Sequence, residues 1–125
     1  DVVKKDYKVD DWVSSIEKLE GTPYKWGGRD SIGIDCSSLI QLGIQTKGIK
    51  FPRNSKDQNK FCNKNIELIN ISRGDLVFWD GHVGTMVNKK NLLHANAYFM
   101  KVVVEPLMHV TNRIGANKKF EIKNF

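Results

Sequence analysis

The pattern of apolar and polar residues divides the chain into a helical first half and a strand-rich second half. Two early segments place apolar residues three or four positions apart, first at Trp12, Val13, Ile16 and Leu19 and then at Cys36, Leu39, Ile40, Gly43 and Ile44. This spacing is typical of one helix face. It predicts one helix over about 11–19 and a second over about 36–46.

Residues at the ends of these segments support the predicted helices. Asp10 or Asp11 is a candidate N-cap of the first helix, and Asp35 is a candidate N-cap of the second. Gly21 and Gly48 come just after the two helices, where a residue in the left-handed conformation is expected.

The segments beside the second helix read as connections. Residues 22–34, which are rich in glycine, are predicted to form a loop. After the second helix, the stretch "FPRNSKDQNKF" predicts a turn that enters a short helix, with Ser55 as a possible cap.

The pattern changes to short β-rich runs from Glu67 onward. These runs are "DLVFW", "HVGTMV", "NLLHANA" and "KVVVEPL", and the tail "NKKFEIKNF" predicts an additional edge strand. Helices followed by strands indicate an α+β fold with an antiparallel sheet. The length of 125 residues fits one domain over 1–125, in which residues 1–10 are expected to be frayed or a linker.

Composition excludes some functional classes and leaves others open. The formal net charge is +6, but the lysines are scattered in runs of no more than two, which favours a solvated surface over nucleic-acid binding. No apolar run approaches the roughly 18 residues that a membrane span needs. The chain begins at Asp1 without a charged-then-apolar leader, as expected of a mature chain or an excised domain. The compartment and the oligomeric state stay open.

Cys36 has two interpretations. A buried cysteine is usually a small apolar filler. A cysteine at a helix N-terminus is instead a candidate nucleophile, because the unpaired N–H groups and the helix dipole favour thiolate. Asp35 would oppose this unless its carboxylate is occupied by backbone N–H groups or a ligand. Cys62 and His109 lack such surroundings and are expected to be structural or surface residues. The sequence has no close-spaced pair of metal ligands, so no zinc site is expected.

His82 and His94 lie on consecutive predicted strands, and their relation depends on the connecting loop. A two-residue loop at Lys89-Lys90 would pair Thr85 with His94 and leave the histidines on opposite faces. A three-residue loop over 88–90 would pair Gly84 with His94 and make the histidines diagonal neighbours on one face. Since a base and its orienting partner need the second geometry, we predict the odd-length loop or an equivalent bulge.

Taken in order, "GTPYKWGG…GIDCSSLIQ", "PRNSKDQ", "RGDLVFW", "GHVG" and "LLHANA" resemble the NlpC-type family of bacterial cell-wall cysteine peptidases. The resemblance runs over about 12–107. It implies a papain-like core, with the nucleophile at the N-terminus of a helix packed on an antiparallel sheet. It also implies cleavage of peptidoglycan stem peptides without a metal or organic cofactor.

The resemblance assigns roles to particular residues. The family's nucleophile falls on Cys36, its general base on His82 and the residue that orients the base on His94. The stretch "HANAYFMKVVVEPL" looks like the branch that hydrolyses the bond between γ-D-glutamate and a diamino acid. In that branch the substrate-binding residues would be Tyr24 and Trp26, which line the site, Asp35 and Ser37, which hold the N-terminal L-alanine portion of the peptide, and Ser55.

Several alternatives remain open on the sequence. Asp35 either recognises the free α-amino group of the stem peptide, or only caps the helix, or does both. Ser38 stands where the family commonly has glycine, and no upstream SH3-like domain is visible in this chain. Other functions of the superfamily are an N-acetylmuramoyl-L-alanine amidase, an acyltransferase and a catalytically inactive wall-binding module. The bacterial cytoplasm, in wall-peptide recycling, and the cell envelope or exterior are both compatible locations.

Overall fold

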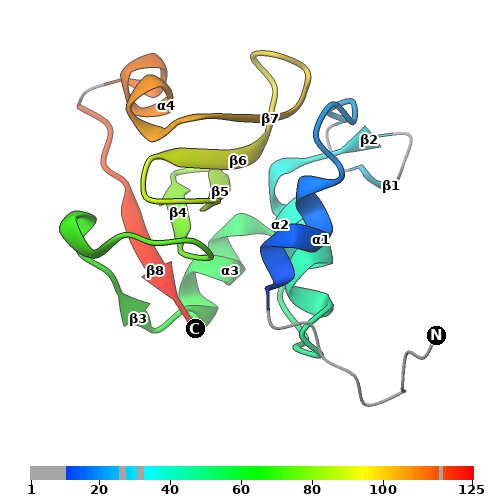
Figure 1. Ribbon diagram of the computed structural model, residues 1–125, viewed down its shortest axis with the longest axis horizontal. Coiled ribbons are helices and arrows are strands. Elements are labelled where there is room, and N and C mark those ends of the chain that lie inside the picture. Colours follow the sequence, from blue (N-terminus) through cyan, green and yellow to red (C-terminus); the bar gives the residue numbers. More distant parts are fainter. Residues whose placement is uncertain (1–10, 26–27, 31–32, 116) are drawn as a thin grey trace.

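The computed structural model describes residues 11–25, 28–30, 33–115 and 117–125, and these form helices around one large antiparallel sheet (Figure 1). The helices are α1 (Trp12–Glu17), α2 (Cys36–Gln45), α3 (Ser55–Phe61), the 3-10 helix η1 (Leu68–Asn70) and α4 (Leu107–Ile114). The strands are β1 (Arg29–Asp30), β2 (Gly33–Ile34), β3 (Lys64–Asn65), β4 (Leu76–Trp79), β5 (His82–Met86), β6 (Asn91–Asn96), β7 (Lys101–Pro106) and β8 (Glu121–Asn124). The predicted α+β class is confirmed.

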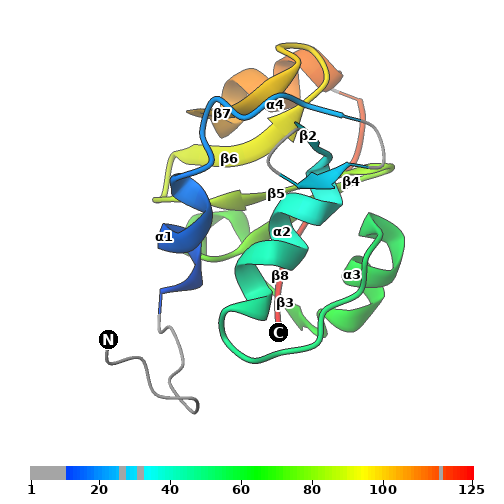
Figure 2. The same ribbon diagram turned by 90° about the vertical axis from the view of Figure 1, so that its right-hand side faces the viewer.

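The six-stranded sheet has the order β3-β8-β4-β5-β6-β7, and every neighbouring pair is antiparallel. Because side chains alternate between the two faces of a strand, β4 sends Leu76 and Phe78 to one side and Val77 and Trp79 to the other. The first face packs against α1 and α2, and the second packs against α4. Figure 2 shows α2 between α1 and α3 in front of the sheet.

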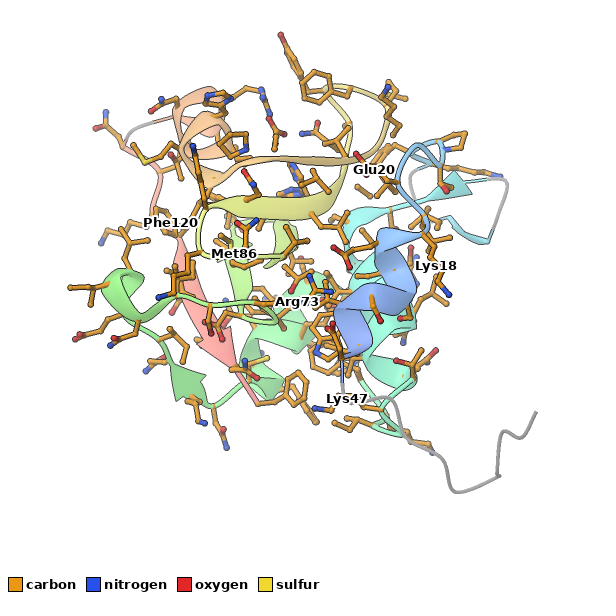
Figure 3. All side chains as sticks on the ribbon, in the orientation of Figure 1. Lys18, Glu20, Lys47, Arg73, Met86 and Phe120 are labelled. Atoms are coloured by element: carbon orange, nitrogen blue, oxygen red, sulfur yellow. The ribbon has the colours of Figure 1, made fainter. Side chains whose placement is uncertain are left out.

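The predicted helices form with different ends and caps. The first is shorter than expected, since α1 stops at Glu17, and Asp11 makes no capping hydrogen bond. The side chain of Asp11 instead accepts hydrogen bonds from Arg73, which also donates to Glu17, so the segment before β4 is tied to α1 (Figure 3). In the third helix the cap is Asn54 rather than Ser55, because the Asn54 side chain accepts from the Asp57 N–H.

The segment predicted as a loop over 22–34 contains regular structure. Its last part forms the β1–β2 pair, and its first part runs along the outer edge of β7. There the Gly21 N–H donates to Val102 O at 2.8 Å, the Val102 N–H donates to Thr22 O at 2.8 Å, and the Tyr24 N–H donates to Met100 O at 2.9 Å. These bonds fix the lead-in to α2 against the sheet.

The C-terminal part differs from the prediction in two ways. The tail strand β8 is not at the edge of the sheet, since it lies between β3 and β4. The helix α4 follows β7 directly and was not expected from the sequence; it places Leu107 and Val110 on the second core. Among the described residues, no helix has the length and apolar character that crossing a membrane requires.

Candidate active site

Cys36 is the first residue of α2, and the residues around it build a complete helix cap. The Asp35 carboxylate accepts from the Ser38 N–H at 2.8 Å, and the Ser38 hydroxyl accepts from the Asp35 N–H at 3.1 Å. The same hydroxyl donates to Gly28 O at 2.6 Å, in the loop that leads to the helix. Ser38, which the sequence left unexplained, therefore closes a capping box and ties the loop to the helix start.

The thiol of Cys36 lies against the beginning of β5. Its Sγ is 4.0 Å from the carbonyl oxygen of Gly81, and the Val83 N–H also faces it, so it contacts the backbone on both sides of His82. Burial and the nearby Asp35 charge raise the pKa of Cys36, although backbone N–H groups oppose them. Burial therefore opposes the thiolate that the helix N-terminus favours.

His82 and His94 are hydrogen-bonded to each other. His82 Nε2 lies 2.7 Å from His94 Nδ1. Thr85 is opposite Leu93 and Met86 is opposite Leu92, so the connection is the predicted three-residue loop over 88–90 and the same register places Gly84 opposite His94. A Cβ on Gly84 would lie 3.0 Å from the Cβ of His94, which confirms why glycine is needed there.

The polar chain continues from His94 to residues that the sequence did not single out. His94 Nε2 lies 2.8 Å from Glu105 Oε2, and Arg113 donates to both oxygens of Glu105, at 3.0 and 2.6 Å. The register of β6 and β7 pairs His94 with Val103, so Glu105 is its diagonal neighbour on the same face. In the sequence, Glu105 could have been noticed as the one acidic residue in the otherwise apolar run "VVVEPL".

Asp35 has a second partner that was also missed. Arg53 donates to both carboxylate oxygens of Asp35, at 3.2 and 3.0 Å, and to the Ser37 hydroxyl at 2.9 Å. Burial raises the pKa of Asp35, but hydrogen bonds from Arg53 and Ser38 outweigh it and hold that pKa below its usual value. Asp35 is thus an ionised cap paired with a guanidinium beside the thiol.

Of the other predicted substrate-binding residues, Tyr24 lies near Cys36 and Ser55 lines a neighbouring pocket. Burial raises the pKa of the Tyr24 phenol, and the proximity of the ionisable groups of Cys36 and Asp35 raises it further. Ser55 and Gly81 line a pocket of about 1000 Å³ between α3 and β8, whereas Trp26 lies outside the described residues. A second pocket of about 250 Å³ is lined by both site histidines and α4.

Cys62 and His109 lie away from the residues described above. Cys62 is 2% exposed within the first core, where burial raises the pKa of its thiol to about 11, and His109 is exposed on α4. Both therefore lie outside the site, as expected. Among the described residues no group of three or more histidine, cysteine or acidic side chains is placed to hold a metal ion.

The sequence profile of the NlpC/P60 family matches residues 21–113, a range that includes Cys36, His82, His94 and Glu105. The chain belongs to the NlpC/P60 family. Among its curated relatives, the γ-D-glutamyl-L-lysine dipeptidyl-peptidase of Bacillus subtilis is 35% identical over 83 residues, which is 60% of this chain. The NlpC/P60 chain spans 28% of that relative's length and less than half of the length of others that it matches.

Solved NlpC/P60 structures agree with the fold. The peptidoglycan hydrolase RipB of Mycobacterium tuberculosis is 24% identical, with a TM-score of 0.77 over 92% of this chain and 63% of its own. RipD of the same organism, described as a non-catalytic NlpC/p60 domain protein adapted to peptidoglycan binding, is 23% identical, with a TM-score of 0.75 over 94% of this chain and 98% of its own. The predicted papain-like α+β fold is therefore confirmed.

Proposed function

We propose that this NlpC/P60 domain is a cysteine endopeptidase that hydrolyses the γ-D-glutamyl–diamino acid bond of peptidoglycan stem peptides. One arrangement carries the proposal. The Cys36 thiol contacts the backbone on both sides of His82, and His82 is hydrogen-bonded to His94 at 2.7 Å. A thiol, a base and a residue that orients the base are the parts that covalent acyl transfer needs. The similarity to the γ-D-glutamyl-L-lysine dipeptidyl-peptidase of Bacillus subtilis supports the choice of bond.

In the first half of the reaction His82 acts as general base. Burial and the nearby His94 lower the pKa of His82, so it is neutral and accepts the Cys36 proton as the sulfur attacks the γ-glutamyl carbonyl carbon. The oxyanion is stabilised by the Cys36 N–H and by the Tyr24 hydroxyl, whose raised pKa keeps it a donor. The carbon–nitrogen bond then breaks, and His82 returns its proton to the leaving amine.

In the second half water replaces the amine. His82 takes a proton from water as the oxygen attacks the thioester carbon, and the carbon–sulfur bond breaks to release the glutamate carboxyl group. The proton returns to Cys36. Asp35, Ser37 and Ser55 hold the stem peptide during both halves, and the amino group of its L-alanine would share the Asp35 carboxylate with Arg53.

Replacing each cysteine in turn tests the proposal. We expect Cys36→Ala to abolish cleavage of L-Ala-γ-D-Glu-diamino acid peptides and Cys62→Ala to retain it, with melting temperatures recorded because Cys62 is a core residue. Activity that survives Cys36→Ala would overturn the assignment of the nucleophile.

Mass spectrometry of digested muropeptides separates the remaining functions. A new free amino group on the diamino acid supports the proposed endopeptidase. Release of the intact peptide from the lactyl group would indicate the amidase, and a new acyl–amine product would indicate an acyltransferase. Binding of muropeptides without any cleavage would indicate a wall-binding module.

A further inference from the structure

The chain of hydrogen bonds from His82 and His94 continues to Glu105 and Arg113, which are not part of the proposed triad. We propose that Glu105 is a positioning residue that fixes which ring nitrogen carries the proton in both His94 and His82. The inference rests on the proposed function for its catalytic meaning, but the proton positions themselves can be measured without substrate.

Glu105 is held as a carboxylate by donors on several sides. Arg113 donates to both of its oxygens, and Asn96 Nδ2 lies 3.3 Å from its Oε2. The Asn96 amide is oriented this way because its Oδ1 accepts from the backbone N–H groups of Tyr98 and Phe99. Burial raises the pKa of Glu105, but the hydrogen bonds from Arg113 and His94 outweigh it and leave the pKa below its usual value.

An ionised carboxylate only accepts hydrogen bonds, which determines the state of His94. His94 Nε2 lies 2.8 Å from Glu105 Oε2 and 3.3 Å from Asn96 Nδ2, and the shorter contact with the carboxylate requires a proton on this nitrogen. Burial lowers the pKa of His94 despite the attraction of Glu105, so the ring is neutral and carries only that proton. Its Nδ1 is then an acceptor.

The same reasoning passes to the next ring. Since His94 Nδ1 accepts, the His82 nitrogen 2.7 Å away, Nε2, must donate. His82 is also neutral, so its Nδ1 holds the lone pair. That nitrogen is the one not engaged by His94, and it is the acceptor that the Cys36 proton requires. Through His94, Glu105 thus leaves Nδ1 of His82 unprotonated, so that this nitrogen can accept the Cys36 proton.

A purely mechanical role is the competing explanation. Glu105 on β7 and Arg113 on α4 form an ion pair of 2.6 Å, and the Arg113 guanidinium packs over the rings of Tyr98 and Phe99 at 4.7 and 4.9 Å. If the pair only tied α4 to the sheet, loss of either partner would have the same effect. The positioning role predicts different effects, because Glu105 is hydrogen-bonded to His94 whereas Arg113 is hydrogen-bonded to Glu105.

The two roles can be separated by NMR of protein labelled with ¹⁵N-histidine, with no substrate present. In the wild type both site histidines should carry the proton on Nε2. In Glu105→Gln the side chain can present either its oxygen, which accepts, or its amide, which donates, to His94 Nε2. We therefore expect His94, and with it His82, to be a mixture of the two tautomers. Arg113→Met should loosen α4 but keep the wild-type tautomers, because the Glu105 carboxylate remains.

Kinetics and a matched control complete the experiment. We expect Glu105→Gln to lower kcat by about 10- to 100-fold with little change in KM, as for loss of a group that orients a catalytic base. Glu17→Ala is the control. Glu17 lies on α1, away from the site, and forms an equally short ion pair of 2.6 Å with Arg73. This variant should leave kcat and both tautomers unchanged.

Two results would overturn the inference: wild-type tautomers in Glu105→Gln, or an equal change of tautomers in Arg113→Met. Predicted tautomers in a wild-type protein that cleaves no stem peptide would instead contradict the proposed function and leave the positioning role supported.

Discussion

Replacing Gly84 with alanine adds a single carbon atom between the two strands that carry His82 and His94. The new Cβ would lie 2.9 Å from Leu92 Cγ and 3.0 Å from His94 Cβ. Carbon atoms in contact are usually about 3.5–4.0 Å apart, so either the His94 backbone retreats by roughly 0.5 Å or β5 moves away from β6. Either movement acts directly on the bond between the histidines.

The consequences differ for stability and for catalysis. Overpacking of this kind costs about 1–3 kcal/mol of unfolding free energy. For a domain of this size that corresponds to a fall in melting temperature of roughly 4 °C per kcal/mol. Lengthening the 2.7 Å bond between the histidines by the same ~0.5 Å brings it to the limit of a hydrogen bond. Since misplacement by about 1 Å can cost 100-fold in rate, we expect Gly84→Ala to lower kcat by about 10- to 100-fold.

Gly43→Ala is a matched control on α2. Its Cβ would lie 2.6 Å from Trp12 Cε3, so it also overpacks the core, partly offset by the roughly 1 kcal/mol that alanine gains over glycine within a helix. We expect it to lower the melting temperature while kcat, measured on L-Ala-γ-D-Glu-diamino acid peptides, stays at the wild-type value. The reasoning is refuted if folded Gly84→Ala keeps wild-type kcat, or if Gly43→Ala loses as much activity.

Three further outcomes are expected. Ser38→Ala should lower the free energy of unfolding in urea by about 1–2 kcal/mol, because the capping box and the bond to Gly28 are lost; a change near zero would contradict this. His82 must be neutral to accept a proton and its pKa is lowered, so kcat/KM should rise with pH through a limb well below pH 6.5, and a limb at 6.5 or above would argue against it as the base. Acetylating the peptide N-terminus should sharply reduce turnover if Asp35 reads the free amine, whereas unchanged turnover would leave Asp35 only its capping role.

Features that depend on local periodicity were predictable from the sequence. The apolar spacing located α2, and the polar residue before it located the cap at Asp35. Side chains alternate between the two faces of a strand, so an odd number of residues in the loop over 88–90 places His82 and His94 on the same face. The placement of His82 beside His94 was therefore predictable once the two strands had been recognised.

Features that depend on contacts between distant elements were not predictable. Glu105 meets His94 only because the turn over 97–100 sets the register of β6 and β7. Arg53 reaches Asp35 only through the packing of α3 beside α2, and no sequence pattern encodes that approach. The raised pKa of Cys36 likewise depends on the strand that covers it, whereas the helix terminus alone favours thiolate.

The bonds between 21–24 and β7 also bear on how the molecule behaves at high concentration. A strand at the edge of a sheet exposes unpaired N–H and C=O groups, to which another molecule can add a strand. Here the first half of β7 is already bonded to the lead-in segment, and the opposite edge is β3, which has only two residues and exposes Lys64. The segment that fixes Tyr24 beside the thiol therefore also protects the sheet from edge-to-edge aggregation, so substitutions that loosen it should promote self-association as well as reduce turnover.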